Sequence, residues 1–262
     1  MISTNTATEY WQSGGSLLVT DALGRHDGAE PANVRIYHFA GTQHVEVETM
    51  PKGVCSTPFN TLDYRPLLRA VLMSLDRWVR DGTPPPPSRH PRIDDGTLVA
   101  MTGPAVTIPG FTPAKGPSAR PRFDYGPDFA KGIVGQVLPV ALADRYGVLV
   151  PKVDRDGNET SGIVMPEIAV PTATSTGWAV RSAKAGGAGE LCYLDGSYLP
   201  FARTKAERAA TGDGRLSLEE RYQSPAERAA KVRAAAEKLA QEGYLLREDV
   251  DRISAQAAAA AW

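Results

Sequence analysis

Glu9 and His44 are two side chains whose types and spacing favour acid–base chemistry. Glu9 follows a short extended start, and His44 lies in a loop directly after the apolar segment 34–40. In hydrolytic triads a carboxylate holds an imidazole in one tautomer, so that the other ring nitrogen accepts the proton of a serine. An acid in one loop, then a strand, then a histidine in the next loop is the chain order of the last two members of a serine, acid, histidine triad.

The other three histidines fit structural roles better. His26 lies in a polar turn and His90 lies beside a run of prolines, so we expect both to be solvated. His38 lies inside the apolar segment, which favours a packed core position. His44 follows a predicted strand at its C-terminal end, where catalytic groups gather in open α/β sheets. The alternatives are an ordinary surface histidine at His44 and, at Glu9, a carboxylate stabilised by a helix N-terminus.

The serine nucleophile that completes such a triad is missing from the sequence. No G-x-S-x-G pattern occurs in it, and Ser16 and Ser118 lack the strand–turn–helix context of a nucleophile elbow. Because the nucleophile precedes the acid in this order, we expect it upstream of Met1, beyond a truncated reading frame or a misplaced start. The oxyanion-hole donors would be missing with it, so residues 1–262 alone are expected to lack acyl-transfer activity.

The elements that position Glu9 and His44 form an α/β unit over residues 1–82. Segment 34–40 is apolar at nearly every position, which predicts a strand covered on both faces. We expect it to run parallel to a short strand at 1–5. Both strands should then form an exposed sheet edge, and unpaired edges favour self-association.

A helix is predicted over residues 62–81, with Asp63 as its N-cap and Gly82 at its end. Five apolar residues recur at helical spacing and share one stripe, which predicts the face that packs on the core. These residues are Leu68, Val71, Leu72, Leu75 and Val79.

The rest of the chain divides into three regions by composition. Prolines in 83–91 indicate a stiff linker. Residues 92–202 predict a loop-rich region with short strands and a hairpin turn at Asp156-Gly157-Asn158. Residues 203–262 predict helices that begin at the N-caps Ser217 and Ser224.

Composition and cysteine spacing exclude several function classes. The net charge of -1 gives no case for nucleic acid, and the chain has no apolar run of membrane-spanning length and no signal peptide. No cofactor or metal site is expected, because Cys55 and Cys192 lack a neighbouring ligand pair and the acidic turn after Asp154 lacks the glycine and glutamate of a calcium loop. The two cysteines are buried thiols, or a disulfide if the protein is exported. The compartment is cytoplasmic by default, and an export signal could belong to a longer form.

Several segments together resemble one known family. They are Asn5–Ser16, Tyr37–His44, 62–70, 78–85, 150–154 and 200–208. The sequence over these segments is similar to the C-terminal portion of a bacterial α/β-hydrolase domain family. The resemblance implies an α/β-hydrolase sheet, a serine–acid–histidine triad and small ester-like substrates. Carried over, Glu9 matches the acid position and His44 the base position.

The sequence therefore predicts a partial α/β-hydrolase fold. Residues 1–82 would supply the last core strands and the last core helix, followed by the 83–91 linker, a loop- and β-rich appended region and C-terminal helices. The alternative is a non-catalytic binding module that uses the hydrolase remnant as a scaffold, with a partner chain covering the sheet. A G-x-S-x-G motif encoded upstream of the start codon would distinguish the first from the second.

Overall fold

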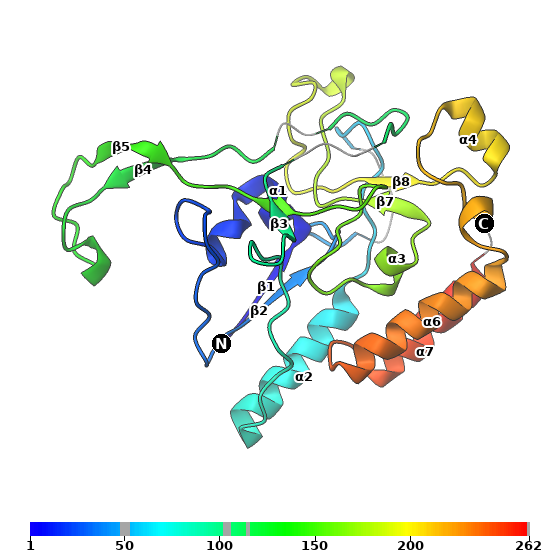
Figure 1. The fold of residues 1–262 in the computed structure, drawn as a ribbon, viewed down its shortest axis with the longest axis horizontal. Helices are drawn as coiled ribbons and strands as arrows, with labels where there is room; N and C mark the ends of the chain where they lie inside the picture. Colours follow the sequence, from blue (N-terminus) through cyan, green and yellow to red (C-terminus); the bar gives the residue numbers. More distant parts are fainter. Residues whose placement is uncertain (48–52, 102–105, 114–115, 261–262) are drawn as a thin grey trace.

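The computed structural model describes residues 1–47, 53–101, 106–113 and 116–260 (Figure 1). The strands form four small two-stranded sheets. They are β1 (Ile2–Thr6), β2 (Arg35–Phe39), β3 (Leu98–Val99), β4 (Pro121–Asp124), β5 (Val140–Arg145), β6 (Val150–Pro151), β7 (Ala173–Ser175) and β8 (Tyr198–Pro200). The α-helices are α1 (Ala7–Ser13), α2 (Arg65–Asp81), α3 (Pro166–Ala169), α4 (Lys205–Thr211), α5 (Leu218–Arg221), α6 (Pro225–Gln241) and α7 (Arg247–Ala259).

β1 and β2 are parallel, as the sequence predicts, in a register that pairs Ile2 with Arg35 and Thr6 with Phe39. The far edge of β2 is not open, because isolated parallel bridges join it to Arg89 and Ile163. Among the described residues β2 is the one strand that pairs with β1, so the expected open edge remains at β1 alone. The prediction that both strands lie at an open edge was wrong for β2.

Among the described residues a small hydrophobic cluster surrounds the two cysteines, and two larger clusters each draw on distant segments. One joins the β2 side chains Tyr37 and Phe39 to Leu67 of α2 and to the inner faces of α6 and α7. The other packs α1, through Tyr10 and Trp11, against β3, β6 and residues 178–180. The sheet that carries the candidate site is thus covered by helices from the C-terminal end of the chain on one side (Figure 1).

Helix α2 forms where the sequence predicts it but turns a different face inward. Its buried residues are Pro66, Leu67, Ala70 and Ser74, and Asp63 lies one residue before the N-cap. The predicted stripe faces mostly outward, since Leu72 is 65% exposed and Val79 81%. Helical spacing identifies residues that share a face, but small residues at 70 and 74 allow the closer approach that fixes which face is buried.

The proline segment packs against the body at several points. The carbonyl of Pro86 accepts a hydrogen bond from Tyr37 Oη, and that of Pro87 accepts one from Tyr244 Oη. Helix α6 begins directly after its predicted N-cap Ser224, whose hydroxyl accepts a hydrogen bond from the Glu227 amide. No helix in the described ranges is both long and apolar enough to cross a membrane.

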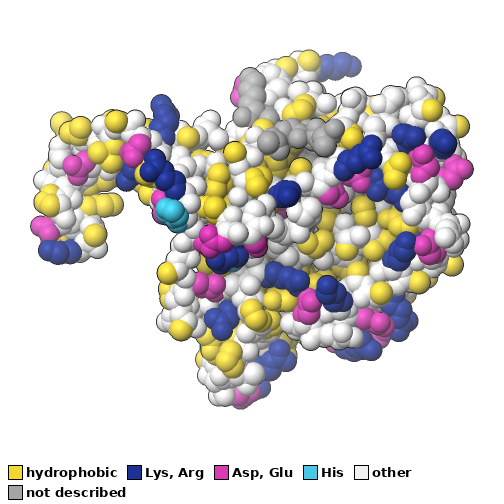
Figure 2. Space-filling view, viewed as in Figure 1, with side chains coloured by type: hydrophobic (Ala, Val, Ile, Leu, Met, Phe, Trp, Pro, Cys, Tyr) yellow, Lys and Arg dark blue, Asp and Glu magenta, His cyan; other side chains and the backbone are white. Residues whose placement is uncertain are grey.

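Strands β4 and β5 form an antiparallel arm that stands away from the body (Figures 1 and 2). Figure 2 shows hydrophobic side chains along it. Val137 is 87% exposed and Leu138 85%, in the segment just before β5.

Cys55 and Cys192 form a disulfide between segments 137 residues apart, with their Cα atoms separated by 5.8 Å. The interpretation as two buried thiols was therefore wrong, and the disulfide alternative holds. Sequence spacing could not decide this, because the two residues meet only through tertiary packing around Ala179 and Phe59. Burial also raises the pKa of nearby Asp195, whose Oδ2 atom lies 3.6 Å from the sulfur of Cys55.

Candidate active site

Glu9 and His44 meet at one end of the β1–β2 pair. Because the two strands are parallel, their C-terminal ends lie side by side. The chain continues from β1 into α1, which contains Glu9, and from β2 into the loop that contains His44. The Nδ1 atom of His44 makes a short hydrogen-bonded contact with the Oε1 atom of Glu9. The structure thus brings the two predicted residues together.

The carboxylate of Glu9 is fixed by the start of its own helix. Thr6 is the N-cap of α1, and Glu9 occupies the third helical position in a capping box. The Oε2 atom of Glu9 accepts hydrogen bonds from the Thr6 amide (2.6 Å) and the Thr6 hydroxyl (2.5 Å). These bonds leave Oε1 for His44. The helix start is itself anchored, because the buried Thr8 hydroxyl donates to the carbonyl of Gly177 at 2.7 Å.

The loop before His44 is anchored at every residue. Gly41 has φ 66°, which favours glycine, and its carbonyl accepts from Asn60 Nδ2 at 2.6 Å. The Thr42 carbonyl accepts from the Ala7 amide at 3.1 Å, which ties the loop to α1. The buried Gln43 accepts from the Gly196 amide through Oε1 at 2.8 Å.

Tyr64 fixes the backbone of His44 from outside, since its hydroxyl donates to the His44 carbonyl at 2.7 Å. Burial raises the pKa of Tyr64, and the negative charges of Glu46 and Glu9 add to the effect. The hydroxyl therefore stays protonated and remains a donor across the neutral range. The backbone around the imidazole is restrained on both sides.

The imidazole itself is accessible. The side chain of His44 is 46% exposed and that of Glu9 23%. With its proton on Nδ1, His44 donates to Glu9 and leaves Nε2 as an acceptor. A histidine held in this way can take a proton from a hydroxyl and return it to a leaving group. This is the chemistry that the two residues can perform.

A second histidine–carboxylate pair is sealed from solvent. His38 Nε2 and Glu159 Oε2 are 2.7 Å apart, with side-chain exposures of 0% and 2%. The ring of Tyr10 packs edge-on against His38, with centroids 4.7 Å apart. His38 is thus a buried core residue, as its place in the strand predicts, and no substrate can reach it.

Glu159 links the two segments that contain the candidate dyad. Its Oε1 atom accepts from Trp11 Nε1 in α1 at 2.7 Å, and its Oε2 atom accepts from the Gly41 amide at 2.7 Å. One carboxylate therefore holds the helix of Glu9 and the loop of His44 in fixed relation. The sequence analysis missed this residue; its only signal is a carboxylate directly after the hairpin turn at 156–158.

Neither serine near a Gly-rich segment takes the missing role. Ser16 is fully buried, and its hydroxyl accepts a hydrogen bond from the Leu149 amide at 3.0 Å. Ser118 lines a different pocket, with Ser13 and Glu190. Both observations agree with the absence of an elbow motif around these serines.

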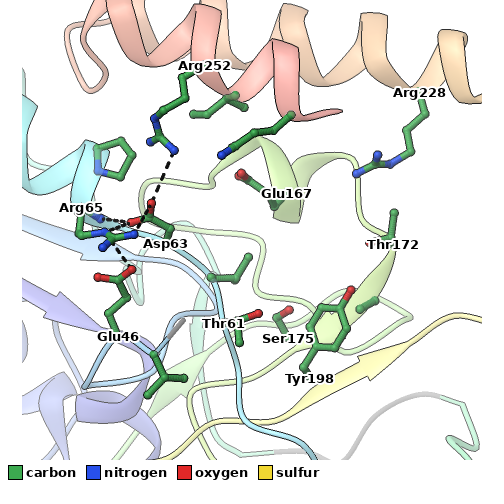
Figure 3. Close-up of a pocket in the computed structure, with 16 residues that line it drawn as sticks. Glu46, Thr61, Asp63, Arg65, Glu167, Thr172, Ser175, Tyr198, Arg228 and Arg252 are labelled. Atoms are coloured by element: carbon green, nitrogen blue, oxygen red, sulfur yellow. Dashed lines mark hydrogen bonds and ion pairs between the residues drawn. The ribbon is translucent and has the colours of Figure 1, made fainter. Parts of the chain in front are cut away.

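A cavity of about 430 Å³ adjoins the loop of His44 (Figure 3). Glu46 and Val47 line it, only two and three residues beyond His44, so the Cα atom of Glu46 lies within roughly 7 Å of that of His44. The same wall contains Asp63 and Arg65, on either side of Tyr64. The cavity lies between the start of α2, helix α3 and the helices α6 and α7.

One group of side chains among the described residues has metal-ligand geometry, namely Cys55, Cys192 and Asp195. Both sulfurs belong to the disulfide, so neither is a thiolate that could bind an ion. This group therefore gives no support for a metal centre in the disulfide form.

No curated protein and no solved structure is significantly similar to this chain. The model of one protein family, described as an alpha/beta hydrolase domain, matches residues 1–255. This match covers nearly the whole chain, including β1, β2, the candidate dyad and all of the residues that line the cavity except Gln256. The chain belongs to this alpha/beta hydrolase domain family.

Proposed function

We propose that Glu9 and His44 are the acid and base of a serine-hydrolase triad that acts on small ester-like substrates. The observation that supports this most directly is the contact of His44 Nδ1 with Glu9, at the C-terminal ends of adjacent parallel strands, with the imidazole open to solvent. Membership in the hydrolase family agrees with this chemistry.

The nucleophile in this proposal is a serine outside residues 1–262, because the sequence contains no G-x-S-x-G motif. The serine hydroxyl gives its proton to His44 Nε2 as the oxygen attacks the ester carbonyl. The imidazolium then gives that proton to the leaving alcohol, and an acyl-enzyme remains. Water repeats the sequence to release the acid, while Glu9 keeps the ring in one tautomer. In this proposal β1, β2 and α2 belong to the last part of the hydrolase core.

The first test uses the chain itself. Long-range nitrogen–proton NMR spectra of the His44 ring distinguish its two tautomers. We expect Nδ1 to be protonated at a pH where the ring is neutral, and Glu9→Gln to make the two forms mix. A predominantly Nε2-protonated ring in the native chain would contradict the assigned roles.

The second test uses a longer chain that includes residues encoded upstream of the start codon, with p-nitrophenyl ester hydrolysis as the assay. Residues 1–262 alone should show no turnover above buffer. In the longer chain His44→Ala should abolish turnover, and Glu9→Gln should lower kcat by about 10⁴-fold. If His44→Ala keeps near-full turnover while folded His38→Ala loses it, the wrong histidine has been assigned. If no frame upstream encodes a G-x-S-x-G motif, the non-catalytic binding module becomes the better proposal.

A further inference from the structure

The cavity beside the His44 loop contains a buried arginine with no partner. Arg228 is 8% exposed, lies in the first turn of α6 and lines the cavity. Its Nε atom is buried without a hydrogen bond, and the guanidinium makes no ion pair with any described residue. In Figure 3 it reaches from its helix towards Thr172, and no interaction line ends on it.

The other two arginines of the cavity already have anionic partners. Arg65 lies 2.9 Å from Glu46 and 2.8 Å from Asp63. Arg252 lies 3.3 Å from Asp249 and 3.7 Å from Asp63. Acidic residues of the protein therefore compensate the charges of these two arginines. The charge of Arg228 has no such partner among the described residues.

The third carboxyl group of the cavity does not compensate Arg228. Burial raises the pKa of Glu167 and the negative charge of Asp63 adds to this, while a hydrogen bond from its own backbone amide and the charges of Arg252 and Arg228 only partly oppose it. Its Oε2 atom is buried without a hydrogen-bond partner in the described structure. The raised pKa widens the pH range in which Glu167 is neutral and can donate a hydrogen bond.

The remaining walls suit a small organic ligand. Thr172 and Tyr198 offer hydroxyls, and Pro66 and Ile253 offer apolar surface. The volume of about 430 Å³ lies within the usual range for small-molecule sites, which combine apolar walls with a few polar groups.

We propose that this cavity binds a small organic monocarboxylate, whose carboxylate pairs with the guanidinium of Arg228. An unpaired buried charge is costly, and a ligand with one negative charge would supply the anionic partner that the protein does not give Arg228. The planar guanidinium matches the two oxygens of a carboxylate. Glu167 lines the same cavity. This site does not depend on the proposed hydrolase activity, because binding occurs without any nucleophile.

The test measures binding of hexanoate to the full chain by calorimetry, with hexanamide and inorganic phosphate as comparison probes. We expect hexanoate to bind and hexanamide, which has the same tail without the charge, to bind at least about tenfold more weakly. Phosphate should also bind more weakly than hexanoate. Equal binding of hexanamide, tighter binding of phosphate, or no hexanoate binding at millimolar concentration would overturn the proposal.

Variants then locate the site. Arg228→Gln should weaken hexanoate binding at least about tenfold, since it removes a charge-assisted hydrogen bond. The matched control is Arg233→Gln on the same helix, where the side chain is 56% exposed and pairs with Glu237. That variant should bind hexanoate as the native chain does. Unchanged binding by folded Arg228→Gln would overturn the assignment. If this variant does not fold, the comparison of hexanoate with hexanamide in the native chain decides alone.

Discussion

The Nε2 atom of His38 and the Oε2 atom of Glu159 lie 2.7 Å apart in a site closed to solvent. The same oxygen accepts a hydrogen bond from the Gly41 amide. The other carboxylate oxygen accepts one from Trp11 Nε1. The inaccessible pair thus holds the segments that carry the accessible pair, α1 and the loop before His44. The inaccessible pair has a structural role, and the accessible pair has the exposure that proton transfer to a substrate requires.

Glu159→Gln should destabilise the protein strongly. Whichever oxygen becomes an amide nitrogen, at least one of the three donors then faces another donor in a buried site. We expect a loss of about 2–4 kcal/mol in the free energy of unfolding, measured by urea denaturation. The control Glu237→Gln removes an exposed pair with Arg233 and should cost no more than about 0.5 kcal/mol. Equal costs for the two variants would mean that the buried network is not formed.

The two paired histidines should differ in stability. His38→Ala removes a fully buried ring and leaves Glu159 with an unmatched acceptor, which should cost roughly 1–3 kcal/mol. His44→Ala removes a side chain that is 46% exposed and should stay within about 0.5 kcal/mol of the native chain. Thermal and urea unfolding of both variants measure this difference. A larger loss at His44 would show that it is a structural residue.

Glu167 should make the stability depend on pH. Because burial raises its pKa in the folded chain, Glu167 favours folding while it is neutral. That contribution is complete at pH values below the ordinary pKa of glutamate. It is lost as the pH rises through the raised pKa of Glu167 in the folded chain. Glu167→Gln should therefore flatten this part of the stability curve and leave the variant more stable than the native chain at the alkaline end. Urea unfolding at a series of pH values from 4 to 8 measures the curve; parallel curves for the two proteins would contradict the assignment.

The disulfide should contribute substantially to stability. Closing a loop between residues 137 apart restricts the unfolded chain, and its loss should cost roughly 2–5 kcal/mol. Cys55→Ala with Cys192→Ala measures this by urea unfolding. Mass spectrometry after alkylation under denaturing, non-reducing conditions should find neither cysteine modified. Two alkylated cysteines in oxidised material would show that the bond does not form.

The face of α2 that packs inward is testable with single substitutions. Leu72→Lys and Val79→Lys alter side chains that are 65% and 81% exposed, so each should change stability by no more than about 0.5 kcal/mol. Leu67→Ala empties a fully buried position and should cost about 2–5 kcal/mol. If the two lysine variants cost more stability than Leu67→Ala, the buried face of α2 would be the one that the apolar spacing predicts.

Local patterns predicted the parts of the fold in which neighbours along the chain decide the structure. The serine N-caps of α5 and α6, the parallel strands and the pairing of Glu9 with His44 all follow from short segments and from strand direction. The buried face of α2 did not follow from such patterns. The apolar spacing of Leu72 and Val79 does not indicate which segments pack against the helix.

The sequence also could not predict the roles of residues that act through long-range contacts. Glu159 and Arg228 lie in segments with no catalytic or binding motif, and their roles depend on what packs around them. The pairing of Cys55 with Cys192 depends in the same way on the approach of two distant loops. Apart from the place of Glu159 directly after a predicted turn, the sequence does not indicate these contacts.

The anchoring of the His44 loop has a consequence for the order of folding. Glu9 and His44 are only 35 residues apart, but Gly41 is held by Glu159 at a separation of 118 and Gln43 by Gly196 at 153. Contacts of such long range form late, because closing the intervening loop costs entropy before it is rewarded. During synthesis from the N-terminus, β1, α1 and β2 can therefore pair early. The imidazole reaches its final setting only after the ribosome has made the chain beyond Gly196.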